Sequence, residues 1–209
     1  QESSGIWGNV AQIFANRSTT KVFTRMRESH EENTTLDDAL FPLVDDAIAH
    51  GSGKDFYVIH LMGGHGLYYF RYPYLFTKFL KDDLAAPENS YSEAKRTEIA
   101  QYANAIYYND YIVSSLIEKF ADKNALVIYL PDHGEAVYDN DSNMSGHVEE
   151  HPNRYMLEVP LIIYGSPAWR AAHPEKWQQI CAAVQRPYMT DDMIHTLLDL
   201  LDIHAQRIA

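Results

Sequence analysis

Cysteine is almost absent from this sequence: Cys181 is the only one among 209 residues. A single cysteine excludes an internal disulfide and any zinc cluster built from several thiolates. Neither a CxxC spacing nor an obvious neighbouring base accompanies Cys181, so we interpret it as a packing residue. Cysteine usage therefore says nothing about the compartment, and a metal site would have to use other side chains.

Basic residues are also scarce, with 17 Lys and Arg against 29 Asp and Glu and a formal net charge of -12. Nucleic acids are bound mainly through clustered Lys and Arg, and no basic stripe is visible. The composition therefore excludes a nucleic-acid partner. It is compatible with a bound cation, because carboxylates are hard metal ligands.

Long apolar runs are the third absence. No run reaches the length of about 18 residues that indicates a membrane-spanning helix, and the N-terminus lacks the basic and apolar regions of a signal peptide. The chain opens on Gln1 without an initiating Met, which indicates a fragment or a processed product. With 46% hydrophobic residues, the composition is that of a soluble globular protein, and the length predicts one domain over 1–209.

Strand-like and helix-like segments alternate along the chain. A short strand is predicted at 21–26, and buried strands are predicted at 56–62, 124–130 and 159–165, where apolar residues run almost without interruption. Helices are predicted at 34–51, 91–120 and 190–203 from their helical apolar spacing. This alternation predicts an α/β fold with a largely parallel sheet.

Local signals set the helix ends and faces. Thr35 is a candidate N-cap, Asp37 favours the dipole of the first turn, and Pro42 predicts a separate or kinked first turn. For the longest helix, Ser90 and Glu93 fit a capping box. Its predicted buried stripe comprises Ile99, Tyr102, Ala103, Ile106, Val113, Leu116, Ile117 and Phe120.

Polar residues follow two of the predicted strands, at the sheet edge where open α/β folds bind ligands. Asp132 and His133 come after Pro131, where the ladder has ended, so both side chains could turn toward one point. A carboxylate and an imidazole are usual zinc ligands, and Gly134 would leave space for an ion. Taken alone, such a pair is more often an ordinary surface turn.

Other histidines are candidates of different weight. His147 and His151 are spaced like an HExxH helix, but Val148 stands where the general base must be, and Pro152 makes a continuing helix improbable. We therefore interpret His151 as a solvated loop residue. His60 lies within the apolar strand predicted at 56–62, and we interpret it as a core histidine. His65 differs because two glycines before it let the backbone turn and bring its imidazole to the strand end.

The segment "GLYYFRYP" after His65 is an aromatic cluster beside the predicted site. Its Arg71 could bind an anionic group of a substrate. A solvated Arg71 packed on tyrosine is the alternative.

The motifs "VIHLMGGHGLYYFRYP", "YNDYIVSSLIEKF", "VIYLPDHGEAV", "SGHVEEH" and "VPLIIYGS" occur in this order over most of residues 55–205. Together they resemble the C-terminal part of the membrane-anchored phosphoethanolamine transferases, in the sulfatase branch of the alkaline phosphatase superfamily. The opening "QESSGIWGN" is similar to the segment that follows the nucleophile region of these enzymes. The resemblance implies an alkaline-phosphatase-like α/β sandwich, of which 1–209 would be the C-terminal portion.

The same resemblance implies an activity and its residues. The activity is transfer of phosphoethanolamine from a phospholipid to a lipopolysaccharide core sugar or lipid A, through a phosphothreonine and Zn²⁺, at the periplasmic face of the bacterial inner membrane. Asp132 and His133 match the zinc-binding pair. His147 and His65 match histidines that contact the transferred phosphoryl group or a second metal, whereas Glu135 matches no metal ligand.

The sequence departs from the family pattern at Gly64 and Leu67, which replace a Ser and a Pro. The threonine nucleophile, another acidic zinc ligand and the membrane anchor are expected upstream of residue 1, so the piece alone should be inactive. Two alternatives stay open. One is a sulfatase or phosphoglycerol transferase of the same superfamily, and the other is a non-catalytic binding domain that retains the fold.

Overall fold

The computed structural model describes residues 17–24, 35–139, 143–148 and 150–203. The chain divides into two compact units, one formed by Gln1–Lys119 and Leu130–Pro160 and the other by Phe120–Tyr129 and Leu161–Ala209. The strand predicted at 21–26 extends outside the described residues, and its described part, 21–24, is not a strand.

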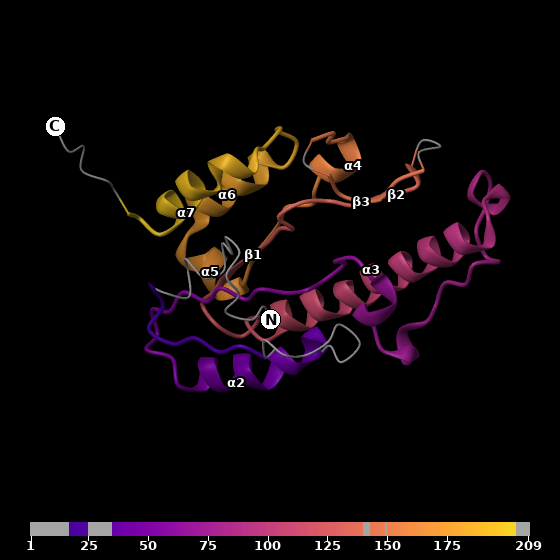
Figure 1. Ribbon diagram of the computed structural model, residues 1–209. Helices are drawn as coiled ribbons and strands as arrows, with labels where there is room; N and C mark the ends of the chain where they lie inside the picture. Colours follow the sequence, from indigo (N-terminus) through magenta and orange to yellow (C-terminus); the bar gives the residue numbers. More distant parts are fainter. Residues whose placement is uncertain (1–16, 25–34, 140–142, 149, 204–209) are drawn as a thin grey trace. The chain divides into compact units, whose positions relative to one another are not determined.

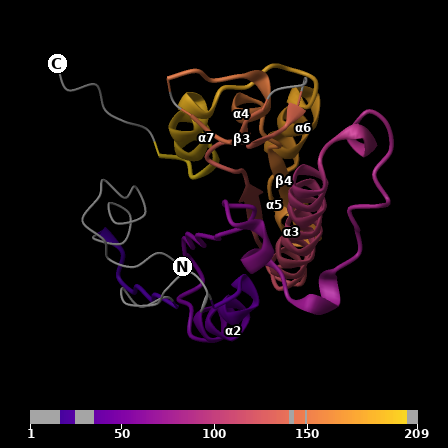
Figure 2. The same cartoon turned by 45° about the vertical axis from the view of Figure 1, so that its right-hand side comes forward.

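The first unit is built around one long helix (Figure 1). In chain order its elements are η2 (Asp37–Leu40), α2 (Phe41–Ala49), η3 (Tyr68–Arg71), η4 (Tyr74–Phe76), η5 (Glu88–Ser90), α3 (Glu93–Glu118), β2 (Ala136–Val137), β3 (Ser145–Gly146) and α4 (Arg154–Leu157). The elements η3, η4 and β2 all contact α3 (Figure 2). The long helix therefore supports both the segment after the GGHG sequence and the segment after the DHGE sequence.

Helix α3 begins two residues later than the predicted capping box. Ser92 is the N-cap, and its side chain accepts a hydrogen bond from the backbone N–H of Lys95. The predicted cap, Ser90, donates instead to the carbonyl of Pro87 and closes η5. Two serines precede the helix, and the hydroxyl of the earlier one, Ser90, is used in the η5 turn, so Ser92 caps the helix.

The buried face of α3 also differs from the predicted stripe, because a polar residue lies at its centre. Asn104 is 1% exposed, accepts from the N–H groups of Lys78 and Phe79, and donates to the carbonyl of Phe79. Ile106, which apolar spacing assigned to the core, is 41% exposed. The buried residues of the helix are Ala100, Asn104, Ala105, Tyr108, Ile112, Val113 and Leu116.

The predicted break at Pro42 is confirmed. A 3₁₀ turn, η2, precedes α2, which has its proline in the first turn, where no intrahelical donor is needed. Asp37 lies in the first turn of η2, as predicted, but its side chain has a further role. It is 6% exposed, and its carboxylate accepts from the backbone N–H groups of Met62 and Gly63.

The second unit contains β1 (Leu126–Tyr129), β4 (Ile162–Gly165), α5 (Pro167–Ala172), α6 (Pro174–Ala183), η7 (Thr190–Asp192) and α7 (Met193–Leu200). Ser166 ties its strands to its first helix. Its hydroxyl accepts from the N–H groups of Ala125 and Trp169 and donates to the carbonyl of Lys123. Ser166 is fully buried, so satisfying these polar groups is a condition for packing the unit.

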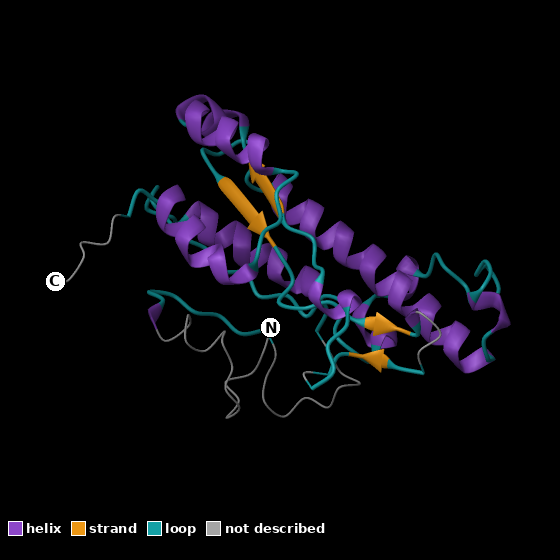
Figure 3. Cartoon of the chain, turned by 90° about the horizontal axis from the view of Figure 1, so that it is seen from above, coloured by secondary structure: helices purple, strands orange, loops and turns teal. Residues whose placement is uncertain are grey.

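Two of the predicted buried strands are present as β1 and β4, but they pair antiparallel, with Leu126 opposite Gly165. The strands β2 and β3 form a separate antiparallel pair (Figure 3). Parallel pairing is therefore not found among the strands of the described residues. The apolar runs identified the two strands but overstated their burial, since every residue of β1 is partly exposed and Ile162 of β4 is 41% exposed. They also carry no information about the direction of a neighbouring strand.

The segment 56–62 is not assigned to a strand. It was predicted to be buried on both faces, yet Phe56 and Val58 are 60% and 54% exposed. Within the described ranges no helix combines the length and the apolar character needed to cross a bilayer.

Candidate metal centre

The DHGE sequence is anchored through its glycine. The N–H of Gly134 donates to the carbonyl of Met156 at 2.8 Å. A Cβ at position 134 would lie 2.1 Å from the carbonyl oxygen of Tyr155, which no side chain tolerates. Gly134 therefore permits close approach of the α4 backbone. The sequence had predicted instead that the absence of a side chain at this position leaves room for an ion.

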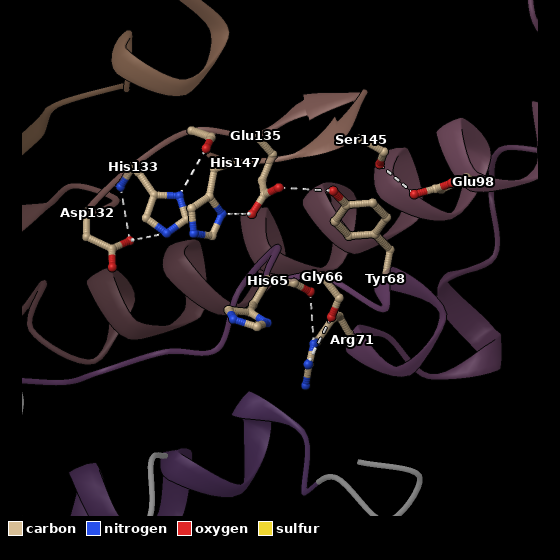
Figure 4. Close-up of polar contacts among 11 residues, drawn as sticks. His65, Gly66, Tyr68, Arg71, Glu98, Asp132, His133, Glu135, Ser145 and His147 are labelled. Atoms are coloured by element: carbon tan, nitrogen blue, oxygen red, sulfur yellow. Dashed lines mark hydrogen bonds and ion pairs between the residues drawn. The ribbon is translucent and has the colours of Figure 1, made fainter. Parts of the chain in front are cut away.

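Three side chains meet around this anchored turn. His133, Glu135 and His147 each offer one ligand atom, and these atoms lie within 4.8 Å of one another. The rings of His133 and His147 are 3.8 Å apart between centroids. Figure 4 shows His147, from the residue after β3, brought beside the DHGE turn. The structure thus joins two residues that the sequence could only place in separate loops.

The hydrogen bonds of the two rings fix their proton positions. Nδ1 of His133 contacts the carbonyl oxygen of Gly134 at 3.0 Å, and Nδ1 of His147 contacts Oε1 of Glu135 at 3.0 Å. Both partners are acceptors, so in the neutral form of each ring Nδ1 carries the hydrogen and Nε2 keeps its lone pair. A neutral imidazole with a free Nε2 is the form that binds a metal ion.

Glu135 is the member of the cluster that the sequence did not predict as a metal ligand. Its side chain is 9% exposed, and while one oxygen accepts from His147, the other accepts from the hydroxyl of Tyr68 at 3.2 Å. Burial, and then the nearby charge of Glu135, raise the pKa of Tyr68, which therefore stays a donor. The sequence could have indicated Glu135, because it is the fourth residue of the DHGE motif.

Asp132 lies at the edge of this cluster. Its Oδ1 is 3.8 Å from Nε2 of His133, and its side chain is 87% exposed. The same oxygen accepts from the N–H of His133 at 3.0 Å. Asp132 thus contacts His133 but is not a member of the cluster of possible ligand atoms, and its role as a metal ligand stays a prediction.

His65 and Arg71 are placed differently from each other. His65 is exposed, on the segment drawn beside the cluster in Figure 4. Arg71 is 5% exposed, and it donates from Nε to the carbonyl of His65 and from an Nη to the carbonyl of Gly66, each at 3.0 Å. Arg71 is therefore buried rather than solvated, and its bonds to two carbonyls shape the loop, while its binding of an anionic group stays a prediction.

Comparison with known proteins identifies the relatives of this arrangement. The model of the family described as Sulfatase matches residues 4–203. The chain belongs to the sulfatase family.

Among the curated relatives of this sulfatase-family chain are transferases. Phosphoethanolamine transferase CptA of Salmonella typhimurium is 35% identical over 186 residues, covering 88% of this chain and 32% of the relative. Phosphoethanolamine transferase EptC of Escherichia coli K12 is 31% identical over 187 residues, with the same coverage. The chain thus spans about a third of the length of these relatives, and the predicted resemblance is confirmed.

A solved structure gives the same result for the fold. The C-terminal periplasmic domain of EptC from Escherichia coli, in complex with Zn, superposes with a TM-score of 0.83 at 27% identity, covering 92% of this chain and 54% of that domain. The predicted fold class, an alkaline-phosphatase-like α/β fold of the sulfatase type, is confirmed.

Proposed function

We propose that this chain is the distal part of a phosphoethanolamine transferase, acting at the periplasmic face of the inner membrane. The donor would be a phospholipid, and the acceptor a lipopolysaccharide core sugar or lipid A. The single observation that carries the proposal is the His133, Glu135 and His147 cluster, in a sulfatase-family chain whose relatives are named phosphoethanolamine transferases. The membrane anchor would lie outside this chain.

The donor set fits Zn²⁺. Two imidazole nitrogens and carboxylate oxygens are its common ligands, and both rings have their Nε2 free. We propose Asp132 and His133 as direct ligands, with His147 facing the same ion or the transferred phosphoryl group. When bound, the metal would lower the pKa of a hydroxyl nucleophile and offset negative charge on the phosphoryl oxygens.

The chain's own residues would then act by position. In the proposed reaction a threonine hydroxyl upstream attacks phosphorus, the bond to the lipid oxygen breaks, and an acceptor hydroxyl later displaces the threonine. His147 and His65 would hold non-bridging oxygens, whose charge is spread in the transition state. Glu135 would hold His147, because its carboxylate keeps the ring hydrogen on Nδ1.

The test is transfer by the full-length polypeptide that contains this chain. Produced in a bacterium whose lipopolysaccharide is unmodified, it should add the mass of one phosphoethanolamine group to lipid A or the core, read by mass spectrometry. His133→Ala and His147→Ala should abolish the addition. His151→Ala, at an exposed position four residues from His147, is the matched control and should retain it.

Other outcomes decide between the alternatives. Release of sulfate from a sulfate ester, or addition of a phosphoglycerol group, would replace the proposal with another activity of the superfamily. Binding of lipid without any transfer would favour a non-catalytic domain.

A further inference from the structure

The loop that carries His65 is held from two sides by buried charged side chains. Asp37 and Arg71 are 6% and 5% exposed. Charged groups are rarely buried to this extent without dedicated partners, because transfer of an ion from water into a protein interior costs on the order of several kcal/mol. Both side chains direct their hydrogen bonds to the backbone of 62–66.

Asp37 fixes the entry of the loop. Its Oδ1 accepts from the N–H of Met62 at 3.1 Å, and its Oδ2 accepts from the N–H of Gly63 at 2.9 Å. Gly63 has a φ of +50°, so the chain turns immediately at this point. The carboxylate thus binds two successive donors where the backbone leaves the extended segment.

Arg71 fixes the exit of the loop. Its planar guanidinium donates from Nε to the carbonyl of His65 and from Nη2 to the carbonyl of Gly66, two donors on the same edge of the group (Figure 4). The N–H of His65 closes a turn onto the carbonyl of Met62 at 3.1 Å. Leu67 follows with a φ of 58°, a left-handed conformation that costs about 1 kcal/mol outside glycine and persists only where the surroundings enforce it.

We propose that Asp37 and Arg71 are positioning residues that hold the backbone on both sides of His65 and so present its imidazole in one place. Four hydrogen bonds from two chain-distant side chains end on this one segment. Arg71 belongs to η3, the same turn whose Tyr68 contacts Glu135. The turn η3 therefore links the loop of His65 to the cluster around His147.

Amide hydrogen exchange on the 209-residue chain tests the clamp. Asp37→Asn keeps the size of the side chain but offers one acceptor oxygen instead of two, so exchange at Met62 and Gly63 should become about tenfold faster, the effect of losing one hydrogen bond. Arg71→Met removes the donors to the carbonyls of His65 and Gly66, so the turn that the N–H of His65 closes onto Met62 should open more often and exchange at His65 should become faster to a similar extent. Asp46→Asn and Arg154→Met, whose wild-type side chains are 74% and 67% exposed, are the matched controls and should leave these amides unchanged.

Unchanged exchange at 62–65 in both Asp37→Asn and Arg71→Met would overturn the proposal. If either variant instead loosens the whole of α3, Arg71→Lys replaces it, because lysine keeps the charge and can reach one carbonyl but not both. Exchange at His65 in Arg71→Lys should lie between the wild-type and unfolded rates. A wild-type rate there would equally overturn the clamp.

Transfer kinetics of the full-length polypeptide test the positioning role, and this arm rests on the proposed function. Asp37→Asn should lower kcat about tenfold, with KM and zinc affinity little changed. In a His65→Ala background the same substitution should cost nothing further, because it acts through that imidazole. If the losses of kcat in Asp37→Asn and His65→Ala were additive, or if Asp37→Asn also lowered zinc affinity, Asp37 would be a general structural residue. If the wild type shows no transfer at all, the proposed function fails while the exchange experiment still decides the clamp.

Discussion

At the scale of single residues, the site depends on which ring nitrogen of each histidine takes part in a hydrogen bond. Both His133 and His147 use Nδ1 for an oxygen acceptor, which leaves Nε2 available. The sequence identifies the histidines through their motifs, but it cannot show that Glu135 and Tyr68 form a chain of contacts to His147. Such contacts depend on how two loops and a 3₁₀ turn pack against one another. Local sequence patterns do not contain that information.

Glu135→Gln should reduce zinc affinity about 10- to 100-fold, the usual effect of losing a carboxylate that orients a metal-binding histidine. Asp132→Ala and His133→Ala should remove binding almost entirely, because they delete proposed ligands. Competition titration against a zinc chelator measures all three, with Glu150→Gln, an exposed acid nearby, as the control. A loss in Glu135→Gln equal to that in His133→Ala would instead make Glu135 a direct ligand.

At the scale of elements, apolar runs and helical apolar spacing predicted the strands β1 and β4 and the helices α2 and α3, whereas the predicted caps, Thr35 and Ser90, are not the observed N-caps. The apolar patterns failed where a polar group decides the packing. Asn104 lies at the centre of the buried face of α3 because it hydrogen-bonds the backbone of 78–79, and an apolar pattern assigns the core to other residues. Strand direction also escaped prediction, since pairing depends on contacts distant in sequence.

The hairpin of β2 and β3 is fastened to α3 by one acid. Glu98 accepts hydrogen bonds from the hydroxyls of Tyr138 and Ser145, which lie on opposite sides of the hairpin turn. Tyr138 has a φ of 63°, so its backbone is in the left-handed region and depends on such support. The hairpin is flanked by Glu135 and His147, so Glu98 indirectly holds the site.

The hydrogen bond to Glu98, followed by burial, raises the pKa of Tyr138 from 10.0 to about 12. Because the folded pKa lies above the unfolded one, the stabilisation by this phenol is complete below pH 10 and is lost as pH rises through about 12. Tyr138→Phe should therefore cost about 1 kcal/mol in the free energy of unfolding at pH 8, and this difference should vanish near pH 12.

Urea unfolding at a series of pH values measures this difference. Tyr74→Phe, at a side chain that is 87% exposed, is the matched control and should cost little at pH 8. A cost of Tyr138→Phe that stays constant to pH 12 would contradict the assigned hydrogen bond.

At the scale of the molecule, every residue of the candidate site lies in the first unit. Asp132, His133, Glu135 and His147 belong to Leu130–Pro160, and His65 belongs to Gln1–Lys119. The second unit supplies none of them. The chain covers 54% of the solved EptC domain. Binding of a metal ion should consequently be a local event in the first unit.

Zinc should slow amide exchange in peptides that cover 62–71 and 130–148 of the 209-residue chain, and leave peptides within 161–203 unchanged. An ion at 100 times its Kd stabilises the state that binds it by about 2.7 kcal/mol, which corresponds to roughly a hundredfold slower exchange wherever opening disrupts the site. The paired variant His133→Ala/His147→Ala should abolish the slowing, while His151→Ala should not. Mass spectrometry of exchanged peptides, with and without a chelator, makes the comparison. Slowing spread evenly over both units, or confined to 161–203, would show that the metal binds elsewhere and that the three clustered side chains are an ordinary hydrogen-bonded turn.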